Sequence, residues 1–106
     1  MQQYEVRRGL GDNIAPANLK AIMQDIFGNV EESDGKLAST FGALKPLFAW
    51  PCDRDLCVET KMDPTVSNEE AQSTIKAYNI FLEKVTGYTA KERGKRAQKK
   101  AKEGKL

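Results

Sequence analysis

The feature that most constrains the fold of this chain is a change in hydrophobic period along the sequence. From Pro16 to Phe27 large apolar residues recur at helical spacing, and a second stripe of the same spacing follows Ser67. Between them, from Val30 to Met62, apolar and polar residues alternate in short runs, which is typical of strands. Because each element has one apolar face, the sequence predicts two helices packed on one face of a sheet.

Each predicted helix has its own start and stop signals. The first, residues 16–27, begins with a proline, whose missing N–H costs nothing in the first turn, and Gly28 follows it. The second begins at a capping box from Ser67 to Glu70 and ends at Gly87. We expect the facing stripes of the two helices to form the core through Leu19, Met23, Ile26, Ile75, Tyr78 and Leu82.

Five short segments are expected to form the sheet: residues 4–8, 30–33, 36–41, 47–50 and 56–62. The first strand would carry Arg7 and Arg8. Asp34-Gly35 is a strong signal for a two-residue hairpin turn. Pro51 limits the fourth strand to a sheet edge or marks its end, since proline cannot donate to the ladder. The predicted order is β-α-β-β-β-β-α, an α+β two-layer sandwich with an antiparallel sheet, two helices on one face and a basic C-terminal helical tail.

The charge distribution divides the chain into two parts. Residues 1–88 form the predicted two-layer α/β domain, and residues 89–106 form a basic C-terminal extension. Residues 91–106 contain eight basic and two acidic residues, a formal charge of +6, whereas residues 1–90 contain nine basic and thirteen acidic residues. The extension opens with a second capping box, Thr89 to Glu92, and is rich in helix formers. It lacks an apolar stripe, so we expect it to be helical when bound and to fray alone.

Such a basic segment indicates an anionic partner, because an array of Lys and Arg releases the counterions condensed on a polyanion. A solvated tail that only confers solubility is the alternative. No aromatic residue follows Tyr88, so base stacking by the tail is not expected. The residues predicted to bind a polyanion are Lys91, Arg93, Lys95, Arg96, Lys99, Lys100, Lys102 and Lys105, extended by Arg7 and Arg8.

The residue types argue against catalysis. The chain has no histidine, which removes the commonest general base and the commonest metal ligand. Two cysteines cannot complete a tetrahedral zinc site within one chain. The clustered carboxylates lie at predicted turns, where Asp and Asn are expected for backbone reasons. We therefore expect no catalytic residue, no metal site, no cofactor and no enzyme activity.

Cys52 and Cys57 flank a predicted hairpin turn. Cross-strand neighbours lie at about the right distance for a disulfide, which requires Cα atoms closer than about 7 Å. Two reduced thiols are the usual state in the cytosol. A disulfide and half of a metal site shared between subunits are the alternatives that the spacing leaves open.

The run Leu47-Phe48-Ala49-Trp50 is apolar throughout, although a sheet covered on one side should have polar residues on the other. Either Phe48 and Trp50 or Leu47 and Ala49 must point away from the helices. An exposed apolar patch indicates an apolar contact surface, such as a ligand cleft or a homodimer interface through the sheet face. A covering loop or the tail is the alternative.

The opening Tyr4-Glu5-Val6-Arg7-Arg8-Gly9, the cysteine hairpin and the segment from Gly87 to Arg93 resemble a small, uncharacterised archaeal protein family of about this length. The order of elements also resembles a single repeat of the TATA-binding protein fold, in which the sheet face opposite the helices binds. Neither resemblance implies a particular chemistry. No DNA-contacting residue of the TATA-binding protein matches a position here.

The sequence as a whole favours a non-enzymatic protein that binds nucleic acid or a ribonucleoprotein through its basic tail. The alternative is a protein-interaction or small-ligand-binding module in which Phe48 and Trp50 are the anchors. The longest apolar stretch, residues 47–50, is far too short to span a membrane, and no secretory signal is visible at the start. We expect a cytoplasmic protein with no membrane partner.

Overall fold

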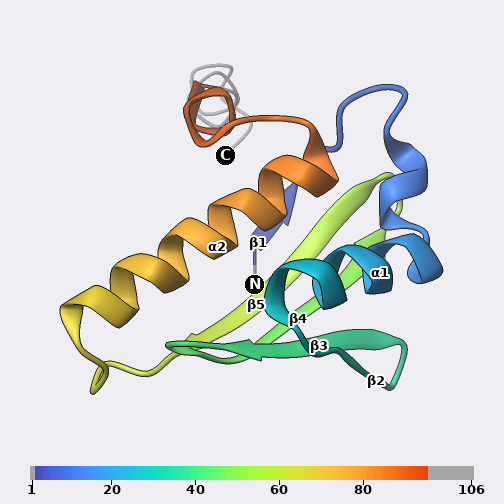
Figure 1. Cartoon of the computed structure of the whole chain (residues 1–106). Helices are drawn as coiled ribbons and strands as arrows, with labels where there is room; N and C mark the ends of the chain where they lie inside the picture. Colours follow the sequence, from blue (N-terminus) through green and yellow to red (C-terminus); the bar gives the residue numbers. More distant parts are fainter. Residues whose placement is uncertain (1, 96–106) are drawn as a thin grey trace.

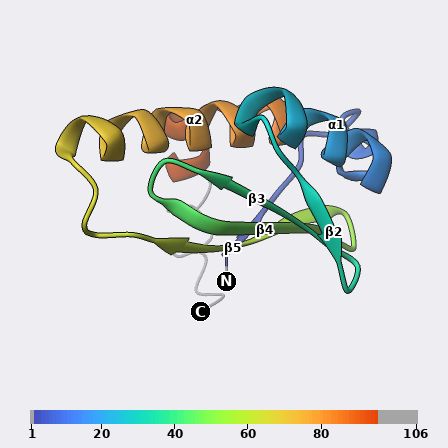
Figure 2. The ribbon, with the colours of Figure 1, turned by 60° about the horizontal axis from the view of Figure 1, so that its bottom comes forward.

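A computed structural model describes residues 2–95 of the chain, and these form an antiparallel sheet with two helices on one of its faces (Figures 1 and 2). The elements in chain order are β1 (Gln2–Tyr4), the short 3-10 helix η1 (Gly11–Ile14), α1 (Pro16–Phe27), β2 (Glu31–Ser33), β3 (Lys36–Phe41), β4 (Leu44–Cys52), β5 (Asp55–Met62) and α2 (Asn68–Thr86). The strand order across the sheet is β1-β5-β4-β3-β2. The predicted α+β two-layer sandwich is confirmed. No helix among the described residues is long and apolar enough to cross a membrane.

The two helices begin and end where the sequence signals indicate. Pro16 occupies the first turn of α1, and Gly28 ends it in the left-handed conformation. At the start of α2 the Glu70 amide donates to Ser67 Oγ over 3.1 Å, which satisfies one of the N–H groups that a helix start leaves without a partner. Gly87 ends α2 with a φ of +80°.

The side of α2 that faces the sheet is rotated from the predicted one, so that Leu82 is buried and Tyr78 partly buried as expected but Ile75 is not. Ile75, expected in the core, is 52% exposed. The buried residues are instead Thr74, Ala77, Phe81, Leu82, Val85 and Thr86. The helix is rotated because Phe81 inserts towards α1, where its ring centroid lies 5.3 Å from that of Phe27.

Thr74 can occupy the buried side of α2 because its hydroxyl has two partners there. It donates to the Glu70 carbonyl over 2.7 Å and accepts from the Ala43 amide over 2.9 Å. A buried hydroxyl with both bonds made costs little. Among the other predicted core residues, Leu19, Met23 and Leu82 are buried. Ile26 and Tyr78 pack partly buried against the core cluster.

The first strand is displaced from its predicted position. β1 pairs with β5 from Gln2 opposite Val58 to Tyr4 opposite Leu56, so Arg7 and Arg8 lie in the following loop rather than in a strand. The chain leaves the sheet because the Arg7 amide donates to the Thr86 carbonyl at the end of α2, over 2.7 Å. The alternating pattern of this segment therefore reflects packing of Tyr4 and Val6 against the core.

The rest of the sheet follows the predicted hairpins. Asp34 and Gly35 both have positive φ, 52° and 78°, as a type I′ turn requires. β4 is longer than expected and lies between β3 and β5, so the prediction that Pro51 could restrict it to an edge is wrong. Pro51 is instead tolerated next to the last residue of the strand.

Comparing Phe81→Ala with Ile75→Ala tests the rotation of α2. We expect the first change to lower the free energy of unfolding by about 3–5 kcal/mol, since it opens a cavity beside Phe27. The second should lower it by only about 0.5 kcal/mol, because the side chain lies half in solvent. Urea unfolding followed by circular dichroism measures both, and equal costs would place α2 in a different rotation.

Candidate functional site

The start of the basic extension is folded onto the domain. Residues 90–95 are helical, and in Figure 1 this short helix lies above the C-terminal half of α2. The predicted capping box forms: the Thr89 amide donates to Glu92 Oε1 over 3.0 Å, and the Glu92 amide donates to Thr89 Oγ1 over 3.2 Å. The first turn of the tail is thus a defined helix start.

Arg93 fixes this helix to α2. Its Nη1 donates to the Tyr88 carbonyl over 2.7 Å, and its Nη2 donates to Asn79 Oδ1 over 3.0 Å, with the side chain partly buried. A guanidinium held by two protein acceptors is less available to phosphate than a solvated one. Arg93, one of the predicted polyanion ligands, therefore has an anchoring role in the structure.

Arg7 connects the N-terminal loop to the same helix. Its Nη2 lies 3.2 Å from Glu92 Oε2, and its guanidinium carbon lies 5.0 Å from the centre of the Tyr88 ring. The two side chains of the ion pair are 49% and 43% exposed, so the pair adds about 1 kcal/mol or less. The charge of Arg7 is partly balanced, but the contact brings the loop and the tail together.

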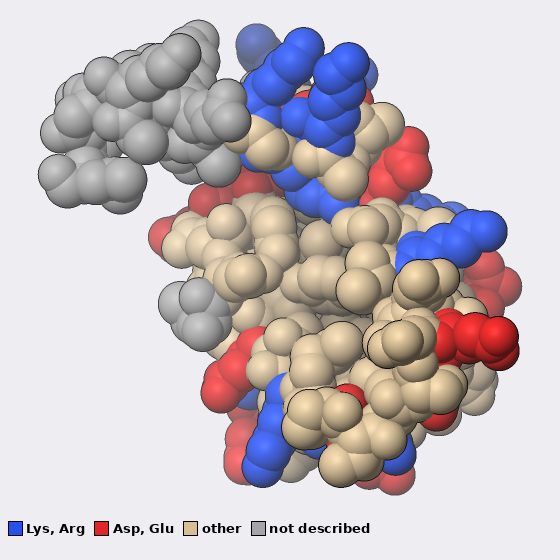
Figure 3. Space-filling view, turned by 90° about the vertical axis from the view of Figure 1, so that its left-hand side faces the viewer, with Lys and Arg blue, Asp and Glu red and all other residues tan. Residues whose placement is uncertain are grey.

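The other basic residues of the described part of the tail, Lys91 and Lys95, are exposed. Figure 3 shows Lys and Arg side chains gathered at this end of the molecule. Arg96, Lys99, Lys100, Lys102 and Lys105, which complete the predicted polyanion-binding set, lie outside the described residues.

Beside the anchored tail lies a groove of about 670 Å³ that contains three arginines. Its lining is supplied by the loop after β1, the β4–β5 turn and the segment after α2, through Val6, Arg7, Arg8, Gly9, Gly11, Ile14, Asp53, Arg54 and Tyr88. The sequence predicted Arg7 and Arg8 as basic contacts but not Arg54. Arg54 was missed because its turn is 46 positions from Arg8 in the chain, and only the fold brings the two residues to one groove.

Gly87 allows the N-terminal loop to lie against the end of α2. A Cβ atom added there would meet Leu10 Cδ1 and, at 3.1 Å, Arg7 Cβ. Gly28 offers a matched position, because it also ends a helix at a φ of +80° but has nothing within 4 Å of an added Cβ.

We therefore expect Gly87→Ala to destabilise the protein more than Gly28→Ala. Both changes carry the cost of a left-handed non-glycine residue, about 1–2 kcal/mol. Only Gly87→Ala also displaces Arg7 and Leu10. Thermal unfolding measures the difference, and amide chemical shifts of residues 7–10 should move in the first variant alone. Equal stability and unmoved shifts would contradict the close approach.

The outer face of the sheet carries the predicted aromatic pair. Leu47 and Ala49 are completely buried beneath the helices, so Phe48 and Trp50 point to the opposite side, where both are half-buried. Lys36 Nζ lies 4.3 Å from the centre of the Trp50 ring, a cation–π contact on that face. The run of four apolar residues is therefore split between the core and the sheet face opposite the helices.

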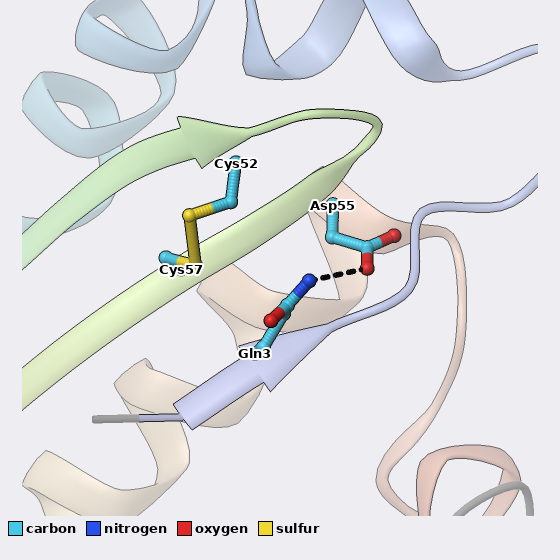
Figure 4. Close-up of a disulfide and its surroundings, with 4 residues drawn as sticks. All are labelled: Gln3, Cys52, Asp55 and Cys57. Carbon is cyan, nitrogen blue, oxygen red and sulfur yellow. Dashed lines mark hydrogen bonds between the residues drawn. A yellow bond between two sulfur atoms is a disulfide. The ribbon is translucent and has the colours of Figure 1, made fainter.

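Cys52 and Cys57 form a disulfide with a Cα–Cα distance of 5.8 Å, which selects one of the three alternatives that the sequence left open (Figure 4). The two residues are diagonal neighbours, since Cys52 lies opposite Asp55 and Cys57 opposite Trp50. Gln3 Nε2 donates to Asp55 Oδ2 over 2.7 Å and links β1 to this hairpin. With both sulfurs bonded to each other, neither is a metal ligand, and no group of three or more potential metal ligands occurs among residues 2–95.

The exposed large apolar side chains lie elsewhere, at the flank of α2. Met62, Ile75 and Ile80 are 45%, 52% and 47% exposed. Ile75 lines two shallow hollows, one shared with Met62 and Tyr78 and the other shared with Ile80. Sequence analysis missed this flank because it assigned Ile75 to the core.

Two titratable groups among residues 2–95 have clearly shifted pKa values, and neither lines the arginine groove. Burial, with a hydrogen bond to Tyr4, raises the pKa of Tyr78 well above its usual range. The hydroxyl and amide of Thr65, with help from Lys45, lower the pKa of Asp63. Tyr78 thus stays neutral and Asp63 stays ionised at neutral pH, so both act as fixed polar groups.

The described residues form a small α+β protein with Lys and Arg side chains gathered at one end. The chain belongs to the family described as domain of unknown function DUF5611, which it matches over residues 1–99. It is similar to the solution structure of hypothetical protein TA0095 from Thermoplasma acidophilum, with 26% identity and a TM-score of 0.63 over 92% of this chain and 97% of that one. No curated protein matches the chain. The expected archaeal-type family is supported, and the likeness to a TATA-binding protein repeat stays a prediction.

Proposed function

We propose that this protein binds nucleic acid, free or within a ribonucleoprotein, through its basic end. The observation that carries the proposal is that residues 90–95 are anchored to the domain by two contacts. Arg93 binds Asn79 of α2, and Glu92 forms an ion pair with Arg7. The tail therefore starts at a fixed position, and its +6 charge begins next to the groove that Arg8 and Arg54 line. A free solubility tail would need no such attachment.

Binding by the tail follows from counterion release. Each phosphate neutralised by a Lys or Arg frees condensed cations, so affinity falls steeply with salt and depends little on base sequence. Lys91 and Lys95 provide the first contacts, and the five basic residues beyond position 95 provide the rest. The protein needs no catalytic group for this role, and we expect none.

A chain that ends at Lys95 tests the proposal, because it keeps Glu92 and Arg93 and so keeps the anchored turn. We expect its thermal stability to match that of the full chain. Its affinity for mixed single-stranded RNA or DNA should fall, and the slope of log affinity against log salt should become shallower by about three units. Fluorescence anisotropy at several salt concentrations measures both quantities.

The matched control is a full-length chain in which Arg96, Lys99, Lys100, Lys102 and Lys105 are all replaced by Gln. It separates loss of charge from loss of length, and it should bind as weakly as the shortened chain. The proposal fails if the full chain does not bind at low salt, or if both variants keep the original salt slope.

A second candidate function is a homodimer formed through the outer sheet face. It is favoured by the half-buried Phe48 and Trp50 on the side of the sheet opposite the helices. Aromatic side chains of this kind are common anchors at the centre of interfaces. The partner in this case is a second copy of the chain.

Light scattering of wild type, Phe48→Glu and Ile80→Glu tests the second candidate. If the sheet face is the interface, wild type is a dimer and Phe48→Glu is a monomer, since a buried charge without a partner is costly. Ile80→Glu changes an equally apolar side chain on the helix side and should remain a dimer. A monomeric wild type at high protein concentration excludes this interface.

A further inference from the structure

We propose that the groove beside the tail binds the phosphate of a nucleotide, with Arg8 and Arg54 as its ligands. The proposal rests on the function proposed above and adds a specific site to it. Arg8 comes from the loop after β1 and Arg54 from the β4–β5 turn, so two segments far apart in the chain each contribute an arginine to the lining of one groove. Guanidinium is suited to phosphate, which it binds through paired N–H donors.

Both arginines are exposed and available. Neither forms a hydrogen bond or ion pair with another residue of the described range 2–95. Arg7, the third arginine of the groove, differs because Glu92 and the Tyr88 ring already engage it. We therefore assign phosphate binding to Arg8 and Arg54, whereas Arg7 forms part of the groove wall.

The remainder of the lining suits the rest of a nucleotide. Val6, Ile14 and the ring of Tyr88 supply apolar surface for a sugar or base. Gly9 and Gly11 present backbone without a side chain, and an added Cβ at either would meet nothing within 4 Å. The groove, at about 670 Å³, lies within the usual size range of small-molecule sites, roughly 300–1,000 Å³.

Asp53 makes the groove selective. Asp53 lines the groove together with the arginines, and its negative charge would repel a bare polyanion that filled the whole groove. It can accept a hydrogen bond from a sugar hydroxyl or a base amino group. A ligand with an anionic end and a donor-bearing end fits this arrangement better than inorganic phosphate does.

Two sources supply this chemistry: a free mononucleotide and the terminal phosphate of a strand held by the tail. The experiment uses the full-length chain and five probes, with binding followed by calorimetry and amide chemical shifts. The probes are adenosine monophosphate, adenosine, inorganic phosphate and a short single-stranded oligonucleotide made with and without a terminal phosphate. The variants are Arg8→Gln and Arg54→Gln, with Lys20→Gln on the exposed side of α1 as the matched control.

We expect adenosine monophosphate to bind more tightly than adenosine or inorganic phosphate. Arg8→Gln and Arg54→Gln should each weaken that binding by about tenfold or more, while Lys20→Gln leaves it unchanged. Shifts in Gly9, Gly11 and Tyr88 amides should accompany binding. We expect each variant to be folded, since both arginines lie in solvent, and thermal unfolding checks this.

The outcomes separate the two proposals. Preference for the phosphorylated strand assigns the site to strand ends, and binding of the mononucleotide alone assigns it to free nucleotides. If adenosine binds as well as its monophosphate, or if neither arginine variant weakens binding, the phosphate site is wrong. If oligonucleotides bind in a salt-sensitive way but equally well with and without the terminal phosphate, binding by the tail is supported and the phosphate site in the groove is wrong. If the protein binds the mononucleotide but its tail binds no oligonucleotide, the groove is supported and the proposed function of the tail is wrong.

Discussion

The contact between the C-terminal end of α2 and the N-terminal loop determines where Arg7, Arg8 and the start of the basic tail lie. A helix end leaves backbone carbonyls without partners, and here the loop supplies two donors. The Arg7 amide donates to the Thr86 carbonyl, and Asn13 Nδ2 donates to the carbonyls of Lys84 and Val85 over 3.2 and 3.3 Å. Gly87 keeps the approach close. The positions of Arg7, Arg8 and Tyr88 all follow from this one junction.

The same junction divides the basic residues into those that are engaged by other side chains and those that are exposed. Arg93 and Arg7 are engaged by Asn79 and Glu92, so their charge mainly holds the tail in place. Lys91, Lys95, Arg8 and Arg54 are exposed. A sequence charge count treats all Lys and Arg alike, whereas the structure shows that only some of them are available to a phosphate.

The large apolar side chains likewise fall into a buried core and two surface groups. The core uses Phe27, Phe81 and the inward residues of β4, and the disulfide fixes the β4–β5 hairpin on the outer side of the sheet. Phe48 and Trp50 lie on the sheet face opposite the helices, and Ile75 and Ile80 lie on the flank of α2. These two surfaces lie on different sides of the molecule, so one variant on each distinguishes a sheet-face dimer from contacts made by the helix.

Local signals in the sequence determined the elements of this protein. α1 begins at Pro16 and ends before Gly28, α2 begins after Ser67, and Asp34-Gly35 forms a hairpin turn. Each of these features depends on backbone conformation within a few residues, which a local pattern can predict. The tertiary structure alone decided the rotation of α2, the loop position of Arg7 and Arg8, and the placement of Arg8 and Arg54 along one groove. These features depend on contacts between residues far apart in the chain, such as Phe81 with Phe27, which no local pattern encodes.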